Sequence, residues 1–191
     1  CIGILSIEDT VQPINGDSFH QPYDLSKENN NIKYSGSCGN YLKYSFDENK
    51  LIIEGNGIMF DYDNEDNVPP WFEYRSIIHT VELPKEITYL GSFAFYQCSN
   101  LNSIIIPPKI SNIPDGLFKE CNSLEKIDFH CNLTSIGSYS FSYCKNLTSL
   151  SIPDTVESIG SSAFSYCSSL INITIPPKVT VIQNYLFYEC E

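Results

Sequence analysis

Cysteine is the residue type in this sequence with the most chemistry open to it, and eight cysteines are present. Five of them, Cys98, Cys121, Cys144, Cys167 and Cys190, recur at a constant step of 23 residues. A constant step places each thiol at the same point of a repeated unit, where a cysteine packs inward as a small apolar side chain. Cα atoms of adjacent units would lie within disulfide range. Side chains in a parallel stack point side by side, however, so we expect these thiols to be reduced.

The other three cysteines stand outside this column. Cys131 lies at a turn position of its unit, where Asp154 stands in the next unit, and we expect it to be the most exposed thiol. Cys1 and Cys38 could form a disulfide, and the sequence leaves both their paired and unpaired states open.

Four carboxylates near the middle of the chain resemble the opening of a calcium-binding loop. Asp61, Asp63, Glu65 and Asp66 are closely spaced, as in such loops. However, Asp66 occupies the position where the loop needs a glycine, and Phe72 the position where it needs a bidentate glutamate. The sequence therefore predicts a solvated acidic loop and no metal site.

The histidines give no pattern typical of catalysis or metal binding. His20, His79 and His130 have no second ligand at a metal-binding spacing. His130 and Cys131 are adjacent, but neighbouring residues of a strand or turn point apart, and no oxyanion donors accompany them. The glycines are spread along the chain and do not form a phosphate-binding loop. We expect a protein that is not an enzyme and binds no cofactor.

The 23-residue period extends to other columns, and each of them is apolar. Phenylalanine stands three residues before every cysteine of the column, and leucine stands three residues after the first four. The remaining columns are Ile104, Ile127, Leu150, Ile173; Ile106, Phe129, Ile152, Ile175; Ile110, Leu133, Val156, Val179; and Ile113, Ile136, Ile159, Ile182. Apolar and polar residues alternate at the end of the segment 147–152, as in a strand with one buried face.

A period of this length with a Leu-x-x-Ile-x-Ile segment is typical of leucine-rich repeats. Equivalent strands would form a parallel ladder with a spacing of about 4.7–4.9 Å. A proline then follows the strand in most units, and the phrase Ile-Gly-x-x-Ala-Phe-x-x-Cys spans residues 159–167. Over residues 38–191 the chain resembles the BspA-like leucine-rich repeat family, found on surface proteins of mucosal bacteria and parasitic protists. The resemblance implies an α/β repeat, a right-handed leucine-rich repeat solenoid with an N-terminal β-hairpin cap.

Five residues depart from the family pattern. Pro114 and Gln183 replace the glycine, Leu117 and Ser140 replace the alanine, and His130 replaces the proline after the strand. These departures leave the predicted architecture unchanged, but they argue against a uniform turn geometry.

The pattern divides the chain into three parts. We expect a poorly packed leader at residues 1–37 and a β-hairpin cap at 38–70, with its turn at 47–49 and its second strand ending at 55–57. Repeats would occupy 71–191, with Phe72 in the phenylalanine column 23 residues before Phe95. No polar capping sequence follows the last repeat. This predicts missing downstream repeats or an exposed apolar face, and we favour truncation.

The net charge of −12 restricts the classes of partner. Residues 1–97 hold 15 acidic and 6 basic residues, and residues 98–191 hold 8 and 5. Nucleic acid and anionic lipid both require a basic patch, so neither is expected as a partner. No apolar run is long enough to span a bilayer, so membrane attachment would need a segment outside this chain.

The outward positions of the strands are the candidate ligand-binding face, because leucine-rich repeats usually bind through their variable strand residues. These ten positions are Thr80, Glu82, Ser103, Ile105, Lys126, Asp128, Ser149, Ser151, Asn172 and Thr174. The opposite turns carry six tyrosines, which could contact a partner or pack between neighbouring coils. They are Tyr96, Tyr139, Tyr143, Tyr166, Tyr185 and Tyr188.

Three possible N-glycosylation sites occur, at Asn132, Asn146 and Asn172. They matter only if the chain enters the secretory route. The family resemblance implies a cell-surface or secreted adhesin-like module that binds host or extracellular-matrix protein. The sequence leaves two alternatives open: a structural spacer in a larger surface protein, and an intracellular interaction scaffold.

Overall fold

The computed structural model describes residues 35–63 and 65–190 of the chain. Most of the predicted leader, including Cys1 and His20, therefore lies outside the described residues. The elements in chain order are β1 (Ser35–Asp47), β2 (Lys50–Met59), the 3₁₀ helix η2 (Phe72–Ile77), β3 (Thr80–Glu82), β4 (Ile87–Tyr89), β5 (Ser103–Ile106), β6 (Asn112–Ile113), β7 (Lys126–Phe129), β8 (Ser135–Ile136), β9 (Ser149–Leu150), β10 (Ser158–Ile159) and β11 (Asn172–Ile173).

Strands β1 and β2 form an antiparallel hairpin with its turn at residues 48–49. The prediction that β2 ends at 55–57 is wrong, because the strand continues to Met59. Gly55 makes this possible. Its φ is 112°, and a Cβ on it would lie only 2.0 Å from the carbonyl oxygen of Tyr41. The glycine therefore lets β2 bulge opposite Tyr41 of β1 without ending the pairing.

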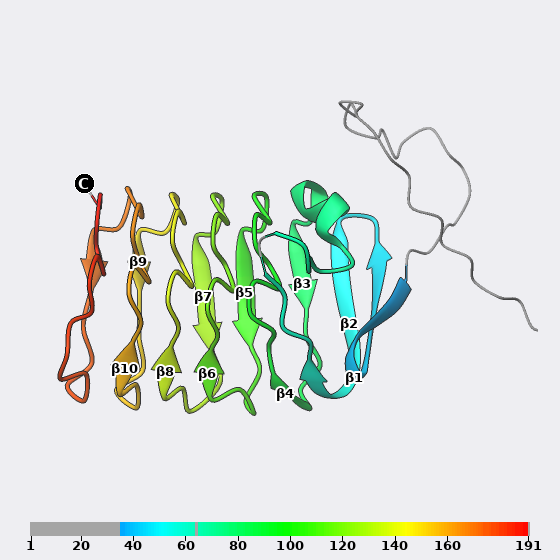
Figure 1. Ribbon diagram of the computed structural model, residues 1–191, viewed down its shortest axis with the longest axis horizontal. Coiled ribbons are helices and arrows are strands. Elements are labelled where there is room, and N and C mark those ends of the chain that lie inside the picture. The colour runs from blue at the N-terminus through cyan, green and yellow to red at the C-terminus, as the bar shows by residue number, and fades with distance from the viewer. Residues whose placement is uncertain (1–34, 64, 191) are drawn as a thin grey trace, which may run out of the picture. The chain divides into compact units, whose positions relative to one another are not determined.

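The coils stack in a row beside the hairpin, as Figure 1 shows, and their first strands form a parallel ladder. The order within the main sheet is β1-β2-β3-β5-β7, and β9 and β11 pair in a separate two-stranded sheet. Ser103 pairs with Lys126 in the ladder, a separation of one repeat. The predicted leucine-rich repeat solenoid with a hairpin at its N-terminal end is therefore confirmed.

A second ladder runs along another side of the coils, and the sequence did not predict it. It consists of β6, β8 and β10, whose isoleucines Ile113, Ile136 and Ile159 are buried. This ladder joins the β7 coil to the β9 coil, between which the first ladder has no pairing. At the other end, β2 pairs with both β3 and β4, so the hairpin covers the first coil along two sides.

The core follows the phenylalanine column. Phe95, Phe118, Phe141 and Phe164 are fully buried, and each ring stacks on the next with centroids 5.4–5.7 Å apart. The prediction that Phe72 precedes Phe95 in this column is wrong. Trp71 takes that place, fully buried and stacked on Phe95 at 6.2 Å.

The register differs at Trp71 for a physical reason. Its indole Nε1 donates a hydrogen bond of 2.8 Å to the carbonyl oxygen of Ala94, which holds the ring in line with the column. Phe72 is displaced outward and stacks on Tyr96 instead. Helix η2 then contains the extra residue before Ile78, which is buried like Leu101 one repeat later.

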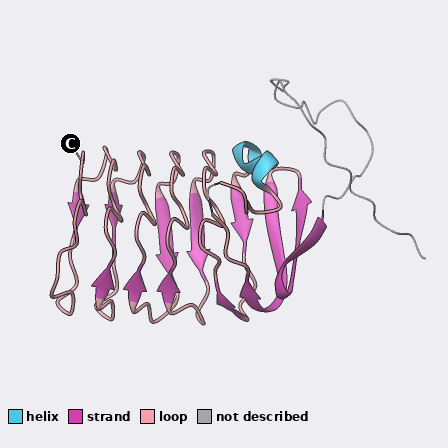
Figure 2. Cartoon of the chain, viewed as in Figure 1, coloured by secondary structure: helices cyan, strands magenta, loops and turns pink. Residues whose placement is uncertain are grey.

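Turns connect the strands of most coils. Among the elements of the described residues, η2 is the only helix (Figure 2). Two turn positions, two residues before and two residues after each core phenylalanine, have positive φ. The non-glycine residues there are Phe93, Tyr139, Ser162, Tyr185 and Gln97, Glu120, Tyr143, Tyr166, Glu189, with φ between 54° and 64°. Each coil thus reverses its direction through two left-handed residues.

His130 shows how a departure from the repeat changes the local geometry. In other coils the proline after the strand accepts a hydrogen bond from the residue three positions later, as between Val156 and Pro153 at 3.0 Å. His130 has the N–H that proline lacks, and it donates to the carbonyl oxygen of Ile106 in the preceding coil at 3.1 Å. The expected variation in turn geometry is therefore present.

The last described coil exposes apolar residues that are buried in the others. Ile182 is 60% exposed, whereas the equivalent Ile159 is 2% exposed. Ile171 and Val181 are also exposed. Among the described residues, this coil has a neighbouring coil on one side only.

Candidate functional site

The cysteine column is a packing feature of the interior. Cys98, Cys121, Cys144 and Cys167 are fully buried free thiols, as predicted. The Sγ of Cys121 donates to the carbonyl oxygen of Phe95 at 3.1 Å, and the next coils repeat this contact. Burial raises the pKa of Cys98 and Cys167 to about 12. These thiols are protonated at neutral pH and are therefore poor nucleophiles.

The cysteines outside the column are also free thiols where the structure describes them. Cys131, predicted to be the most exposed, is half-buried and packs against the core, and burial raises its pKa. Cys38 is fully buried, and burial raises its pKa to about 11. Its predicted alternative partner, Cys1, lies outside the described residues.

The acidic loop uses its carboxylates as structural acceptors. Asp63 Oδ1 accepts hydrogen bonds from the backbone N–H groups of Glu65 and Asn67, at 2.9 and 3.0 Å. Asp61 Oδ1 accepts from the Tyr89 hydroxyl at 2.7 Å and from the Ser92 N–H at 2.8 Å. Burial acts to raise the pKa of Asp61, but these hydrogen bonds outweigh it and lower the pKa.

The histidines and carboxylates do not converge on one point. His79 places its Nδ1 2.9 Å from the carbonyl oxygen of Ile77, and His130 is exposed directly after β7. Across residues 35–63 and 65–190, no group of three or more His, Cys, Asp or Glu side chains is placed to share a metal ion.

The ten predicted strand-face residues lie on the strands or directly beside them, and all are exposed except Asp128, which is half-buried. Pairing in the ladder brings Thr80 beside Ser103, Ser103 beside Lys126, Ile105 beside Asp128, and Ser149 beside Asn172. The interruption between β7 and β9 leaves the last four positions outside the continuous sheet.

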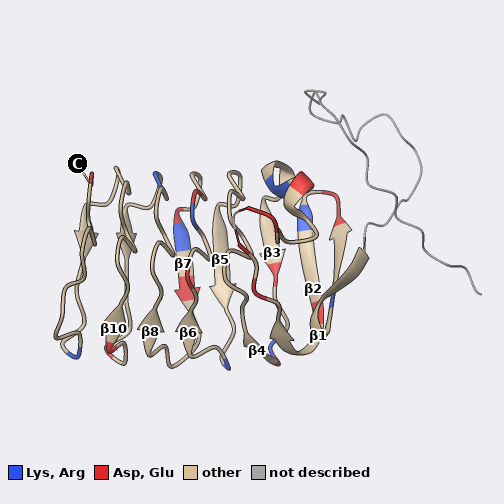
Figure 3. Ribbon diagram, viewed as in Figure 1, with Lys and Arg blue, Asp and Glu red and all other residues tan. Residues whose placement is uncertain are grey.

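Charge on the strand face is arranged in pairs. Lys126 Nζ lies 2.7 Å from a carboxylate oxygen of Asp128 on the same strand, and Lys50 forms an ion pair with Glu82. Between these pairs lies Ile105, whose side chain is 54% exposed. Figure 3 shows charged residues of β7 on this face and mostly uncharged coils toward the C-terminal end. The face thus presents an apolar side chain flanked by ion pairs.

The structure also places the three sequon asparagines. All are exposed: Asn132 lies in a loop, Asn146 in a turn and Asn172 on β11. The asparagine side chains are therefore accessible from solvent.

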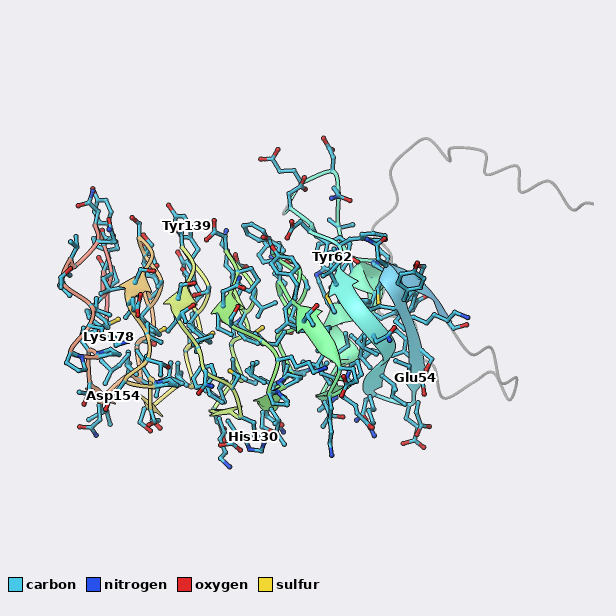
Figure 4. The ribbon with its side chains drawn as sticks, turned by 90° about the horizontal axis from the view of Figure 1, so that it is seen from below. Glu54, Tyr62, His130, Tyr139, Asp154 and Lys178 are labelled. Atoms are coloured by element: carbon cyan, nitrogen blue, oxygen red, sulfur yellow. The ribbon has the colours of Figure 1, made fainter. Side chains whose placement is uncertain are left out.

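A groove at the turns, which we call the tyrosine groove, is a further candidate site. The sequence predicted its tyrosines as possible partner contacts, but not the groove that they line. It has a volume of about 400 Å³ and is lined by Lys119, three serines and five tyrosines. The tyrosines are Tyr139, Tyr143, Tyr166, Tyr185 and Tyr188. In Figure 4, Tyr139 lies on the opposite edge of the coils from His130 and Asp154.

The groove arises from one position of the repeat. The residue directly after each core phenylalanine is long in the outer coils, as in Tyr96, Lys119 and Tyr188. In the two coils between them it is a serine, Ser142 or Ser165, and both serines are buried. A comparison of side-chain sizes down this column could have revealed the groove from the sequence.

No helix within residues 35–63 and 65–190 has the length and apolar character needed to cross a membrane.

Comparison with known proteins places the repeats in a family. Residues 70–191 match a model of the BspA type leucine rich repeat region, in six copies. A search of curated protein sequences finds no match to the chain.

Among solved structures, the chain is similar to a leucine-rich repeat protein from Bacteroides ovatus, with 24% identity and a TM-score of 0.59, over 80% of this chain and 44% of that protein. It is also similar to the leucine-rich repeat protein of T. pallidum, with 22% identity and a TM-score of 0.53, over 78% of this chain and 65% of that protein. The chain thus spans less than two thirds of either protein. These similarities support the fold.

Leucine-rich repeats of this kind are protein-interaction modules and are generally non-catalytic. Since the match covers more than half of its length, this chain belongs to the BspA type leucine rich repeat family.

Proposed function

We propose that this chain is a protein-binding module without catalytic activity, from an adhesin-like protein that is displayed on the cell surface or secreted. Its partner would be a host or extracellular-matrix protein. The observation that carries this proposal is the strand face, where exposed side chains of differing chemistry stand at fixed spacing on a rigid parallel ladder. In this proposal residues 38–70 cap the ladder and residues 71–191 carry the binding surface.

The strand face has the properties of a site that binds by surface complementarity. Its backbone is fixed by ladder hydrogen bonds, so a partner would meet side chains that need little further ordering. Ile105 offers a central apolar contact, and the ion pair of Lys126 and Asp128 beside it offers charge-dependent specificity. The ten strand-face residues are therefore the proposed ligand-binding residues.

The proposed location is supported by two observations. The chain resembles a family found on surface proteins, and the three sequon asparagines Asn132, Asn146 and Asn172 are exposed. Recovery of glycosylated protein from the cell exterior would support the location. Recovery only from inside the cell would favour the intracellular scaffold instead.

The binding test uses a panel of immobilised extracellular-matrix proteins, with albumin as the negative surface. Lys126→Glu and Asp128→Lys are made singly and together, because reversing both charges keeps the ion pair. We expect each single reversal to weaken binding by about tenfold, the equivalent of about 1.4 kcal/mol. The double variant should recover part of the loss.

Lys178→Glu is the matched control for the single reversals. Lys178 is also an exposed lysine in an ion pair, with Glu157 at 3.0 Å, but it lies at a turn away from the strand face. Its reversal should leave binding unchanged. If the unmutated protein binds no member of the panel, the spacer interpretation replaces the adhesin proposal.

A further inference from the structure

The open surface of the tyrosine groove consists of ring faces. Ser142 and Ser165 share a hydrogen bond of 2.8 Å between their hydroxyl oxygens, and Ser165 Oγ also lies 3.0 Å from the carbonyl oxygen of Ser162. The floor of the groove has therefore satisfied its own polar groups. What remains for a ligand are the walls, where Tyr139, Tyr185 and Tyr188 are 46%, 67% and 46% exposed.

The rings are arranged at right angles at one end of the groove. Tyr143 and Tyr166 stack face to face with centroids 4.2 Å apart. Tyr188 meets both Tyr166 and Tyr185 edge to face, with interplanar angles of 82° and 89°. Ring faces of different orientation thus border one space, and the negative face of a tyrosine ring attracts a cation.

Preceding turns, and one wall of the groove itself, already carry cations over aromatic rings. The Arg75 guanidinium lies 3.8 Å from the centroid of Phe72, the Lys119 ammonium 5.3 Å from Tyr96, and the Lys145 ammonium 6.0 Å from Tyr143. Within the described part of the chain, no cation lies over the rings of Tyr139, Tyr166, Tyr185 or Tyr188. Tyr143 therefore already has a cation near its ring, whereas the more exposed Tyr139, Tyr185 and Tyr188 do not.

Charge near the open end favours a positive ligand. Glu189 follows Tyr188 directly, is exposed, and forms no ion pair with any described residue. Lys119, at the other end, lies over Tyr96 and 4.0 Å from Glu120, so its charge is engaged there. The whole chain carries a net charge of −12, which attracts basic partners from a distance.

We propose that the tyrosine groove binds a lysine or arginine side chain from an extended basic segment of a protein partner. This inference rests on the proposed function, because it assumes that the partner is a protein. The composition of the groove walls supports it, because tyrosine supplies contact area at low entropy cost. The cation enters between the rings at the Tyr185 and Tyr188 end, beside Glu189.

The test is a titration of the full chain with the peptide acetyl-Gly-Ser-Arg-Ser-Gly-Arg-Ser-Gly-amide, followed by NMR of the tyrosine rings. The control peptide carries citrulline, an uncharged analogue, in place of both arginines. We expect the arginine peptide to shift the ring signals of Tyr139, Tyr166, Tyr185 and Tyr188, and the citrulline peptide to leave them unchanged.

The variant is Tyr139→Asn with Tyr185→Asn, since asparagine tolerates the positive φ of 56° and 59° at these positions. We expect it to bind the arginine peptide about five- to thirtyfold more weakly, the loss of two cation–ring contacts. Tyr41→Asn is the matched control, because Tyr41 is 86% exposed, has a φ of 60°, and lies on the hairpin. It should bind like the unmutated protein.

Three results would overturn the inference: no ring shifts with the arginine peptide, equal binding of the citrulline peptide, or equal binding by the double variant. Equal binding by the double variant would mean that the peptide responds only to the overall negative charge. These failures are separable from failure of the proposed function. Matrix binding that is lost in Lys126→Glu but kept in the double tyrosine variant would leave the strand-face proposal intact.

Discussion

The ring of Phe141 lies between two others, with centroids 5.6 Å from Phe118 and 5.4 Å from Phe164, and it is fully buried. We expect Phe141→Ala to lower the free energy of unfolding by about 3–5 kcal/mol, because the cavity lies between two coils that cannot both close over it. Urea denaturation followed by circular dichroism measures the change. Phe187→Ala is the control from the same column. Phe187 is half-buried and stacks on one ring only, so its replacement should cost less.

A second prediction at this scale concerns the buried thiols. Burial raises the pKa of Cys167 to about 12 from the usual 9.0. Between these two values the unfolded chain loses the thiol proton while the folded protein keeps it, so the free energy of unfolding falls as pH rises. The stabilising contribution is fully present below pH 9.0 and is lost progressively above it.

The comparison that isolates this effect is between the unmutated protein and Cys167→Ala. From pH 8 to pH 10 the variant should lose about 1.4 kcal/mol less stability than the unmutated protein, one pH unit of titration for a single thiol. Tyrosine ionisation is common to both proteins and cancels in the difference. Identical pH dependence in the two proteins would show that Cys167 is not protected from ionisation.

Individual core residues could be predicted from the sequence wherever a column repeats. The Phe and Cys columns are examples, since every coil supplies an independent observation of the same position. Trp71 could not be placed in this way, because two aromatic residues are adjacent there and the step from Trp71 to Phe95 is 24 residues. Its register depends on a hydrogen bond to Ala94 that the sequence does not show.

At the scale of a single element, the turn that contains Gly116 tests the left-handed positions of the coil. Gly116 has a φ of 60°, and a Cβ there would lie 2.3 Å from Cε1 of Phe93. Gly116→Ala should therefore reduce stability by about 2–3 kcal/mol, through backbone strain and displacement of the ring. Thermal unfolding measures the change.

Ser162 occupies the same turn position two coils later, with a φ of 55°. Glycine adopts this left-handed backbone at lower cost than serine, so Ser162→Gly should relieve strain and stabilise the protein by up to about 1 kcal/mol. The two substitutions should move the melting temperature in opposite directions. A shift in the same direction would mean that φ at this position is not the property that decides stability.

The elements differ in how well the sequence could predict them. The first strands could be predicted, because alternation over four residues is visible in segments such as 126–129. The second ladder could not, since β6, β8 and β10 have two residues each, too few to show a period of two. The sequence predicts a strand end at Gly55 because glycine is typical of both strand ends and bulges, and only the pairing with the opposing strand decides between them.

At the scale of the whole molecule, the identity of the candidate binding residues could be predicted from the sequence, but their arrangement could not. The 23-residue period predicts the ten outward strand positions. It does not show that Lys126 and Asp128 pair with each other or that the first ladder is interrupted after β7, because both depend on contacts of individual side chains and coils. The tyrosine groove depends on residues that differ between coils. Ser142, for example, occupies the position that Lys119 occupies one coil earlier, and a search for residues shared by all coils does not detect such a difference.

In the turns around the core phenylalanines, backbone N–H groups donate to the following coil, and this gives the last prediction. The N–H groups of Phe141 and Phe164 donate to the carbonyl oxygens of Ala163 and Leu186 in the following coil, at 2.9 and 3.0 Å. By the same pattern, the N–H of Phe187 in the last coil has no acceptor among the described residues. Stability in such an array comes from neighbour contacts, so the last coil should open locally before the others.

Amide hydrogen exchange followed by NMR measures this directly. We expect the amides of Tyr185, Phe187 and Glu189 to exchange orders of magnitude faster than those of Phe118 and Phe141, whose N–H groups are bonded to the next coil. The exposed Ile182 beside them should not add protection. Equal protection of the first and last coils would mean that the array unfolds as one cooperative unit, and the sum of neighbour contacts would then be the wrong description of its stability.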